Sequence, residues 1–193
     1  IIKKFIGEHE NFLNTYFDVE TTIKGTHTPY LICSIDDNNY KLEYNIMKNG
    51  ENFIYYWLCG LKQNTRLIAH NASYDYKFIY KYLTNINNEI LKGSNLIFVS
   101  ANFYNKFTKT NIKIQIINSL NLIPMKLKLF SNAFQIPYDK EIINYNFYTD
   151  ENIKKVFCPI DYFIKDFNND EKNIFYKNIT KWKIERIWNF IKL

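Results

Sequence analysis

An alternating stretch near the N-terminus, Asn-Thr-Tyr-Phe-Asp-Val-Glu-Thr-Thr at residues 14–22, constrains the fold of this 193-residue chain more than any other segment. Aromatic and β-branched residues predict a strand at about residues 15–22, and in a strand residues two apart share a face. Asp18 and Glu20 therefore lie side by side, where two carboxylates repel each other and are costly to bury. A divalent cation held between them removes that cost, because hard cations prefer oxygen ligands. The alternative interpretation is a solvent-exposed edge strand that carries two acids.

The composition predicts a globular chain with a polyanionic partner. Hydrophobic residues make up 47% of the sequence, enough to form the core of a single domain over residues 1–193. The net charge of +6 favours nucleic acid, because cations released from phosphates drive such binding. No apolar run approaches the roughly 20 residues that span a bilayer, so we expect no membrane partner.

Residue usage also indicates a compartment. The three cysteines, Cys33, Cys59 and Cys158, are odd in number and lack the Cys-x-x-Cys spacing, which favours a reducing, intracellular compartment. Asn, Ile, Lys, Phe and Tyr are abundant and have AT-rich codons, which indicates an organellar, plasmid or viral gene. We favour a mitochondrial location over a plasmid or viral one.

Hydrophobic periodicity predicts an α/β fold with a mixed central sheet flanked by helices. Strands are expected at about residues 15–22, 30–35, 40–46, 66–70, 95–100, 103–108 and 111–118. Helices are expected at about residues 52–61, 71–83, 126–134 and 170–193, with Leu127, Phe130 and Phe134 facing inward in the third. We expect a polar connector at residues 85–93 and a loop at residues 137–169.

A second acidic stretch lies at residues 67–75, where a short apolar strand ends and a helix begins. Asn71 or Ser73 can cap this helix, and Asp75 then falls in its first turn, where the helix dipole favours a carboxylate. Ligands in α/β sheets collect at the carboxyl ends of strands, so we expect Asp75 to lie close to the first pair of acids. The alternative interpretation is a simple capping arrangement without a metal.

Together, these stretches resemble the 3′–5′ exonuclease domain of protein-primed family B DNA polymerases, found in phages, linear plasmids and mitochondrial plasmids. Three motifs of that family are similar to Phe17-Asp-Val-Glu-Thr-Thr22, Ala69-His-Asn-Ala-Ser-Tyr-Asp75 and Asn118-Ser-Leu-Asn-Leu-Ile123. The resemblance extends from about Tyr16 to about Phe190. It implies a ribonuclease-H-like fold and 3′–5′ exonuclease activity.

The resemblance further implies two divalent ions, Mg²⁺ or Mn²⁺, held by Asp18, Glu20, Asp75 and one further Asp. Paired ions of this kind activate water and stabilise the leaving 3′ oxygen.

A single-stranded DNA 3′ end is the partner that the resemblance implies. Thr21, Asn71 and Tyr74 would hold it, with secondary contacts from Ser119 and Leu120. Stacking of a base on an aromatic ring is tolerant of sequence, which suits Tyr74, although a core aromatic beneath the helix is an equal alternative. For His70 we favour a packed or backbone-bonded histidine over a metal ligand.

The chain also departs from the family pattern. The third exonuclease motif, Tyr-x-x-x-Asp, is expected just beyond Leu193, although Tyr162 and Asp166 have its spacing. The fourth metal ligand is therefore not identified, and Asp161 and Asp170 are further candidates. Asn118 stands where the family usually has Asp, and the lysine expected near Cys158 is missing. We expect a fragment of a longer polymerase, or a stand-alone remnant, that ends before the third motif.

These departures keep a second function open. The alternative is a catalytically inactive, polymerase-derived subunit with a structural or nucleic-acid-binding role, whose partner is RNA or a ribonucleoprotein such as a mitochondrial ribosome. A third alternative is an unrelated α/β domain whose acids only cap helices and face solvent.

Overall fold

The computed structural model describes residues 11–22, 27–136, 144–154 and 159–181. The chain divides into two compact units, the first formed by Ile1–Val19 with Leu31–Pro124 and the second by Glu20–Tyr30 with Met125–Leu193. The sequence predicted one domain over residues 1–193, and these two units lie within that range. No helix in the described ranges has both the length and the apolar character that are needed to cross a membrane.

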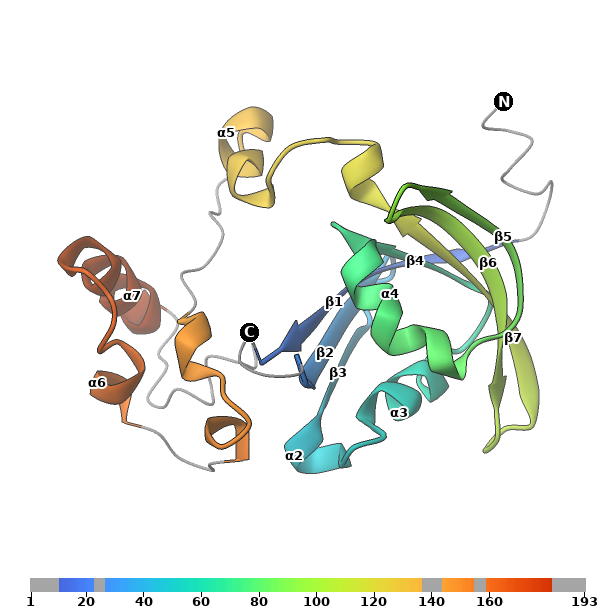
Figure 1. The fold of residues 1–193 in the computed structure, drawn as a ribbon, viewed down its shortest axis with the longest axis horizontal. Coiled ribbons are helices and arrows are strands. Elements are labelled where there is room, and N and C mark those ends of the chain that lie inside the picture. The colour runs from blue at the N-terminus through green and yellow to red at the C-terminus, as the bar shows by residue number, and fades with distance from the viewer. Residues whose placement is uncertain (1–10, 23–26, 137–143, 155–158, 182–193) are drawn as a thin grey trace. The chain divides into compact units, whose positions relative to one another are not determined.

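A mixed seven-stranded sheet, in the order β3-β2-β1-β4-β7-β6-β5, organises the chain and confirms the predicted α/β class (Figure 1). The strands are β1 (Leu13–Thr21), β2 (Pro29–Asp36), β3 (Lys41–Asn45), β4 (Thr65–Ala69), β5 (Thr84–Lys92), β6 (Asn95–Asn105) and β7 (Thr110–Asn118). β4 pairs in parallel with both β1 and β7, so these three strands end at the same edge of the sheet. The hairpins β2–β3, β5–β6 and β6–β7 are antiparallel.

The helices of the first unit are α2 (Ile46–Asn49), α3 (Phe53–Cys59) and α4 (Ala72–Ile79), with the 3₁₀ turns η1 (Tyr80–Tyr82) and η2 (Ser119–Asn121). Figure 1 shows α3 and α4 on the concave side of the curled β5–β7 region. Trp57 of α3 is fully buried, its ring centroid lies 5.6 Å from that of Phe17, and its Nε1–H donates to Ser34 Oγ at 2.9 Å. Burial of these rings against β1 and β2 fixes α3 on the sheet.

The second unit has a small aromatic core. Its elements are η3 (Leu127–Leu129), α5 (Phe130–Phe134), η4 (Tyr145–Phe147), η5 (Asn152–Lys154), α6 (Ile160–Phe163) and α7 (Asn169–Lys181). Phe163 is fully buried and lies 5.0 Å from Phe147 and 5.5 Å from Phe175, measured between ring centroids. Two buried asparagines support this core, since the side chain of Asn144 donates to the carbonyl of Phe163 and that of Asn152 to Phe147.

The predicted connector at residues 85–93 was wrong, because this segment is the edge strand β5. Most of its side chains are exposed and its pairing with β6 is irregular, so it lacks the apolar alternation that predicts a strand. The strands expected at 95–100 and 103–108 are one continuous strand, β6.

The predicted helix at residues 126–134 is shorter, beginning with a 3₁₀ turn and continuing as α5. Leu127 and Phe134 were expected to face inward, but they are 44% and 49% exposed. The last predicted helix begins as expected, as α7, whereas residues 182–193 lie outside the described residues.

Candidate active site at the carboxyl ends of β1, β4 and β7

The turn between β4 and α4 has an unusual backbone at Asn71, whose φ of 69° and ψ of 40° are left-handed. Asparagine tolerates this conformation better than most residues. The predicted side-chain cap was wrong for Asn71, which makes no capping bond, and the hydroxyl of Ser73 instead accepts from the Leu96 N–H at 2.8 Å. The backbone N–H groups at the start of the helix instead donate hydrogen bonds to a side chain at the end of another strand.

Asn118, at the end of β7, supplies those bonds. Its Oδ1 accepts from the backbone N–H groups of Asn71, Ala72 and Leu120 at 3.1, 3.3 and 3.1 Å. Its Nδ2 donates to the Leu96 carbonyl at 2.9 Å, and the residue is 1% exposed. An amide can accept and donate at once, whereas a carboxylate can only accept. The asparagine that departs from the family pattern therefore joins three segments at this edge of the sheet.

Asp75, in the first turn of α4, is held against β1. Its side chain is 3% exposed, and its Oδ1 accepts from the backbone N–H of Val19 at 3.0 Å. Val19 follows Asp18 directly, so this bond places the Asp75 carboxylate against the peptide group that links Asp18 to Val19. A buried carboxylate requires such partners, because its desolvation is otherwise costly.

β1 itself shows the alternation that the sequence predicted. Phe17 and Val19 are buried, whereas Asp18 is exposed and Glu20 is partly exposed. The two carboxylates therefore leave the strand on its less buried side. β1 passes from the first unit into the second between Val19 and Glu20.

In the second unit, Glu20 has a neighbour that the sequence did not reveal. Tyr148 is 3% exposed, and burial, then Glu20 and Tyr145, raise the pKa of its phenol above the ordinary value. Its ring stacks on Tyr30 with centroids 5.0 Å apart. Tyr148 keeps its proton at neutral pH and lies near enough to Glu20 to sense its charge. It belongs to the stretch whose poor periodicity predicted only a loop, and we find no local signal for its role.

Among the residues that the structure describes, no three His, Cys, Asp or Glu side chains form a ready-made metal-binding group. The donor chemistry of Asp18, Glu20 and Asp75 nevertheless fits a hard cation, since all three supply carboxylate oxygens. The buried Asp75 is already oriented by the Val19 amide. The metal site stays a prediction for these three residues.

Ser119 and His70 form a structural pair next to Asn118. Ser119 Oγ donates to the Ala69 carbonyl at 3.2 Å and lies 3.2 Å from His70 Nδ1. These two contacts hold the imidazole of His70 beside Ser119. The structure thus brings Ser119, Leu120 and Asn71 together around one asparagine.

Two further residues were predicted to contact DNA. Tyr74 is half-buried on α4; its ring meets Phe78 edge-on at 5.4 Å, and Lys77 Nζ lies 5.9 Å from the ring centroid. Thr21, at the end of β1, is 8% exposed. Tyr74 is neither a fully buried core residue nor a fully exposed one, and its contact with a base stays a prediction.

A family model described as DNA polymerase type B, organellar and viral, matches residues 59–192, which is more than half of the chain. The match contains Asp75, Asn118 and Ser119 and begins after the pair Asp18 and Glu20. A search of curated proteins finds no match.

Solved structures of phi29 DNA polymerase share the fold. The enzyme complexed with single-stranded DNA matches 90% of this chain with 19% identity and a TM-score of 0.58. Its post-translocation binary complex with primer-template DNA matches 84% with 16% identity and a TM-score of 0.55. This chain spans only 32% and 28% of those polymerase chains. The likeness confirms the ribonuclease-H-like α/β architecture.

Proposed function

The chain belongs to the type B DNA polymerases of organelles and viruses, and we propose that it carries the 3′–5′ exonuclease site of such an enzyme. The proposed reaction is hydrolysis of the 3′-terminal phosphodiester of single-stranded DNA, with release of mononucleotides. The matching phi29 structures are complexes with single-stranded and with primer-template DNA, which supports DNA as the partner.

One observation carries the proposal most strongly, the hydrogen bond from the Val19 amide to Asp75 Oδ1 at 3.0 Å. It joins two acidic stretches that are separated by more than fifty residues in the sequence. It holds the Asp75 carboxylate beside the strand that carries Asp18. The bond supports a shared role for Asp75 and Asp18.

Asp18, Glu20 and Asp75 would hold divalent ions, Mg²⁺ or Mn²⁺, through their carboxylate oxygens. When bound, such ions supply an activated water and stabilise the leaving 3′ oxygen. The chain's own contribution is to fix the carboxylates, because the Val19 amide orients Asp75 and β1 sets the spacing of the other two. The candidates in this chain for a fourth acidic ligand are Asp161, Asp166 and Asp170, all of which are exposed.

The DNA end would be held by residues around the β4–α4 turn. Asn71 is exposed and its side-chain amide makes no capping hydrogen bond to α4, so this side chain can contact a nucleotide. The ring of Tyr74 offers a surface on which a base can stack. Ser119 and Leu120 follow Asn118 directly and can support the strand, and Thr21 lies at the end of β1.

The test is release of mononucleotides from labelled single-stranded DNA in Mg²⁺ or Mn²⁺. We expect Asp18→Ala and Asp75→Ala each to lower the rate by more than about 100-fold, since loss of a direct ligand exceeds the effect of losing an outer partner. Glu43→Ala is the matched control, because Glu43 is an exposed acid on the strand β3. No release at any concentration of either metal would contradict the proposal, as would full activity of both variants.

A second candidate is a non-catalytic subunit that binds nucleic acid or a ribonucleoprotein, for example in a mitochondrion. Its support is the net charge of +6 together with Asn118 at the position where the family usually has an acid. Salt-sensitive binding of RNA or DNA, without cleavage, would favour this candidate over the exonuclease.

A further inference from the structure

A groove of about 480 Å³ lies on the first unit beside Gly60, in the segment that precedes β4, whereas Asp75 follows the other end of that strand. It is lined by Tyr44, Lys48, Asn49, Tyr56, Cys59, Gly60 and Phe107. Three of these side chains are aromatic, one is basic and none is acidic. The exonuclease proposal assigns this surface no role.

Two aromatic rings are presented at the groove. Phe107 is 69% exposed and Tyr56 is 36% exposed, and their rings are stacked with centroids 6.2 Å apart. Tyr55 lies behind both, with its ring 6.3 Å from Phe107 and 5.6 Å from the buried Phe103. The exposed rings therefore rest on the core.

Hydrogen bonds fix the β6–β7 hairpin that carries Phe107. Asn105, which is 5% exposed, donates from Nδ2 to the Cys59 carbonyl at 3.1 Å and accepts from the Phe107 N–H at 3.0 Å. The Lys106 N–H donates to the hydroxyl of Tyr55 at 3.2 Å. Phe107 is thus held against α3, and the platform is formed before any ligand arrives.

The charged side chains that line the groove or belong to its hairpin are lysines. Lys48 lines the groove and Lys106 precedes Phe107. The sequence from 95 to 118, which forms β6, the hairpin and β7, contains three lysines and no acid.

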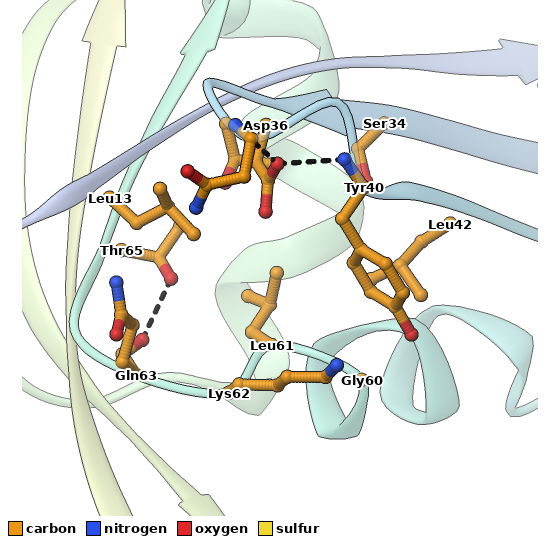
Figure 2. A pocket seen from close by; sticks show the side chains of 12 residues that line it. Leu13, Ser34, Asp36, Tyr40, Leu42, Gly60, Leu61, Lys62, Gln63 and Thr65 are labelled. Atoms are coloured by element: carbon orange, nitrogen blue, oxygen red, sulfur yellow. Dashed lines mark hydrogen bonds between the residues drawn. The ribbon is translucent and has the colours of Figure 1, made fainter.

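A second cavity, of about 230 Å³, lies next to the groove, and Gly60 lines both. It also has an aromatic ring beside a lysine. Figure 2 shows Tyr40 and Lys62 at its rim, and the Lys62 Nζ lies 4.2 Å from the centroid of the Tyr40 ring. The acid of this cavity, Asp36, accepts hydrogen bonds from the backbone N–H groups of Asn38 and Tyr40. Aromatic rings and ammonium groups therefore recur along this end of the unit.

We propose that this groove is a second binding site for single-stranded nucleic acid, separate from the exonuclease site. Bases stack on Phe107 and Tyr56, and Lys48, Lys106 and Lys62 neutralise phosphates. Fixed aromatic rings beside lysines are what sequence-tolerant strand binding requires. A protein partner fits less well, because lysine is depleted in protein–protein interfaces.

The test uses a short, covalently closed circle of single-stranded oligothymidylate, labelled for fluorescence anisotropy, in EDTA. A circle has no 3′ end to enter an exonuclease site, and without metal nothing is cleaved. We expect Phe107→Ala and Tyr56→Ala each to weaken binding roughly 5- to 150-fold, the range for loss of one stacked base. Lys48→Ala should reduce the slope of log affinity against log salt by about 0.7.

Two control variants separate this site from its surroundings. Tyr104→Ala removes a 41% exposed ring from the same hairpin. Tyr104 follows the buried Phe103 and therefore lies on the other face of β6, so this change should leave binding unchanged. Asp75→Ala should also leave it unchanged, so failure of the exonuclease proposal is distinguishable from failure of this one. The proposal would be overturned if the native chain had no affinity for the circle, or if Phe107→Ala and Tyr56→Ala bound it as tightly as the native chain does. So would the finding that these variants lose a protein partner instead.

Discussion

The regions at the two ends of β4 differ in how their side chains are held and in how far they are exposed. At the carboxyl end, buried polar side chains are tied to particular backbone groups, as Asn118 is to Asn71 and Leu96. On the amino-terminal side, rings stack on one another and remain exposed, as Tyr56 and Phe107 do. Directional bonds fix groups in position, whereas stacking accepts many partners.

The difference suits two kinds of task. The proposed hydrolysis of one phosphodiester requires groups in fixed positions, and the bond to the Val19 amide fixes the carboxylate of Asp75. Holding a strand of any sequence requires only flat faces and positive charge. The same comparison predicts where mutation should disturb the fold and where it should disturb only binding.

The largest effect on stability is expected from Asn118→Ala. This change leaves three backbone N–H groups without their acceptor, of which that of Ala72 is buried and the other two are partly buried. A buried unsatisfied group costs about 1–3 kcal/mol and a lost hydrogen bond about 0.5–1.5 kcal/mol, so we expect the free energy of unfolding, measured by urea denaturation, to fall by about 3 kcal/mol.

Two related variants sharpen this result. Asn118→Asp keeps an acceptor for the N–H groups but turns a second carboxyl oxygen toward the Leu96 carbonyl, so we expect a cost of about 1–3 kcal/mol for the lost hydrogen bond. This cost should grow as the pH rises and the buried carboxyl group ionises. Asn121→Ala is the matched control, because its exposed side chain donates to the same carbonyl and should contribute less than about 1 kcal/mol. Equal stability of Asn118→Ala and the native chain would refute the role assigned to Asn118.

The sequence predicted the parts of the fold that follow local rules. Alternation identified β1, and helical spacing identified α3 and the start of α4, because one face of each is buried. It failed at β5, since an exposed edge strand buries too little to impose a pattern. It also failed to show that Leu127 is exposed, because spacing says nothing about whether a partner surface exists.

For the site, the sequence predicted which acids to consider and could not predict what holds them. The bond between Asp75 and Val19 and the three bonds to Asn118 join segments far apart in the chain. Such contacts depend on the register of β1, β4 and β7, which no local pattern encodes. The sequence did not predict a role for Tyr148 for the same reason, since its proximity to Glu20 arises only in the folded chain.

The smallest effect on stability is expected at the other end of β4. Phe107 is 69% exposed, so Phe107→Ala should change the free energy of unfolding by less than about 0.5 kcal/mol. Urea denaturation under the conditions used for the Asn118 variants checks this value. A loss of several kcal/mol would mean that the ring supports the core and that the contrast between the two ends is wrong.

A metal site that Asp75 shares with Asp18 is tested most directly by calorimetric titration of Mn²⁺ into the native chain and into Asp75→Asn and Asp18→Asn. We predict that the native chain binds the ion and that either substitution abolishes or strongly weakens the binding, because each removes a charged oxygen ligand. Absence of binding by the native chain, or undiminished binding by both variants, would contradict the account.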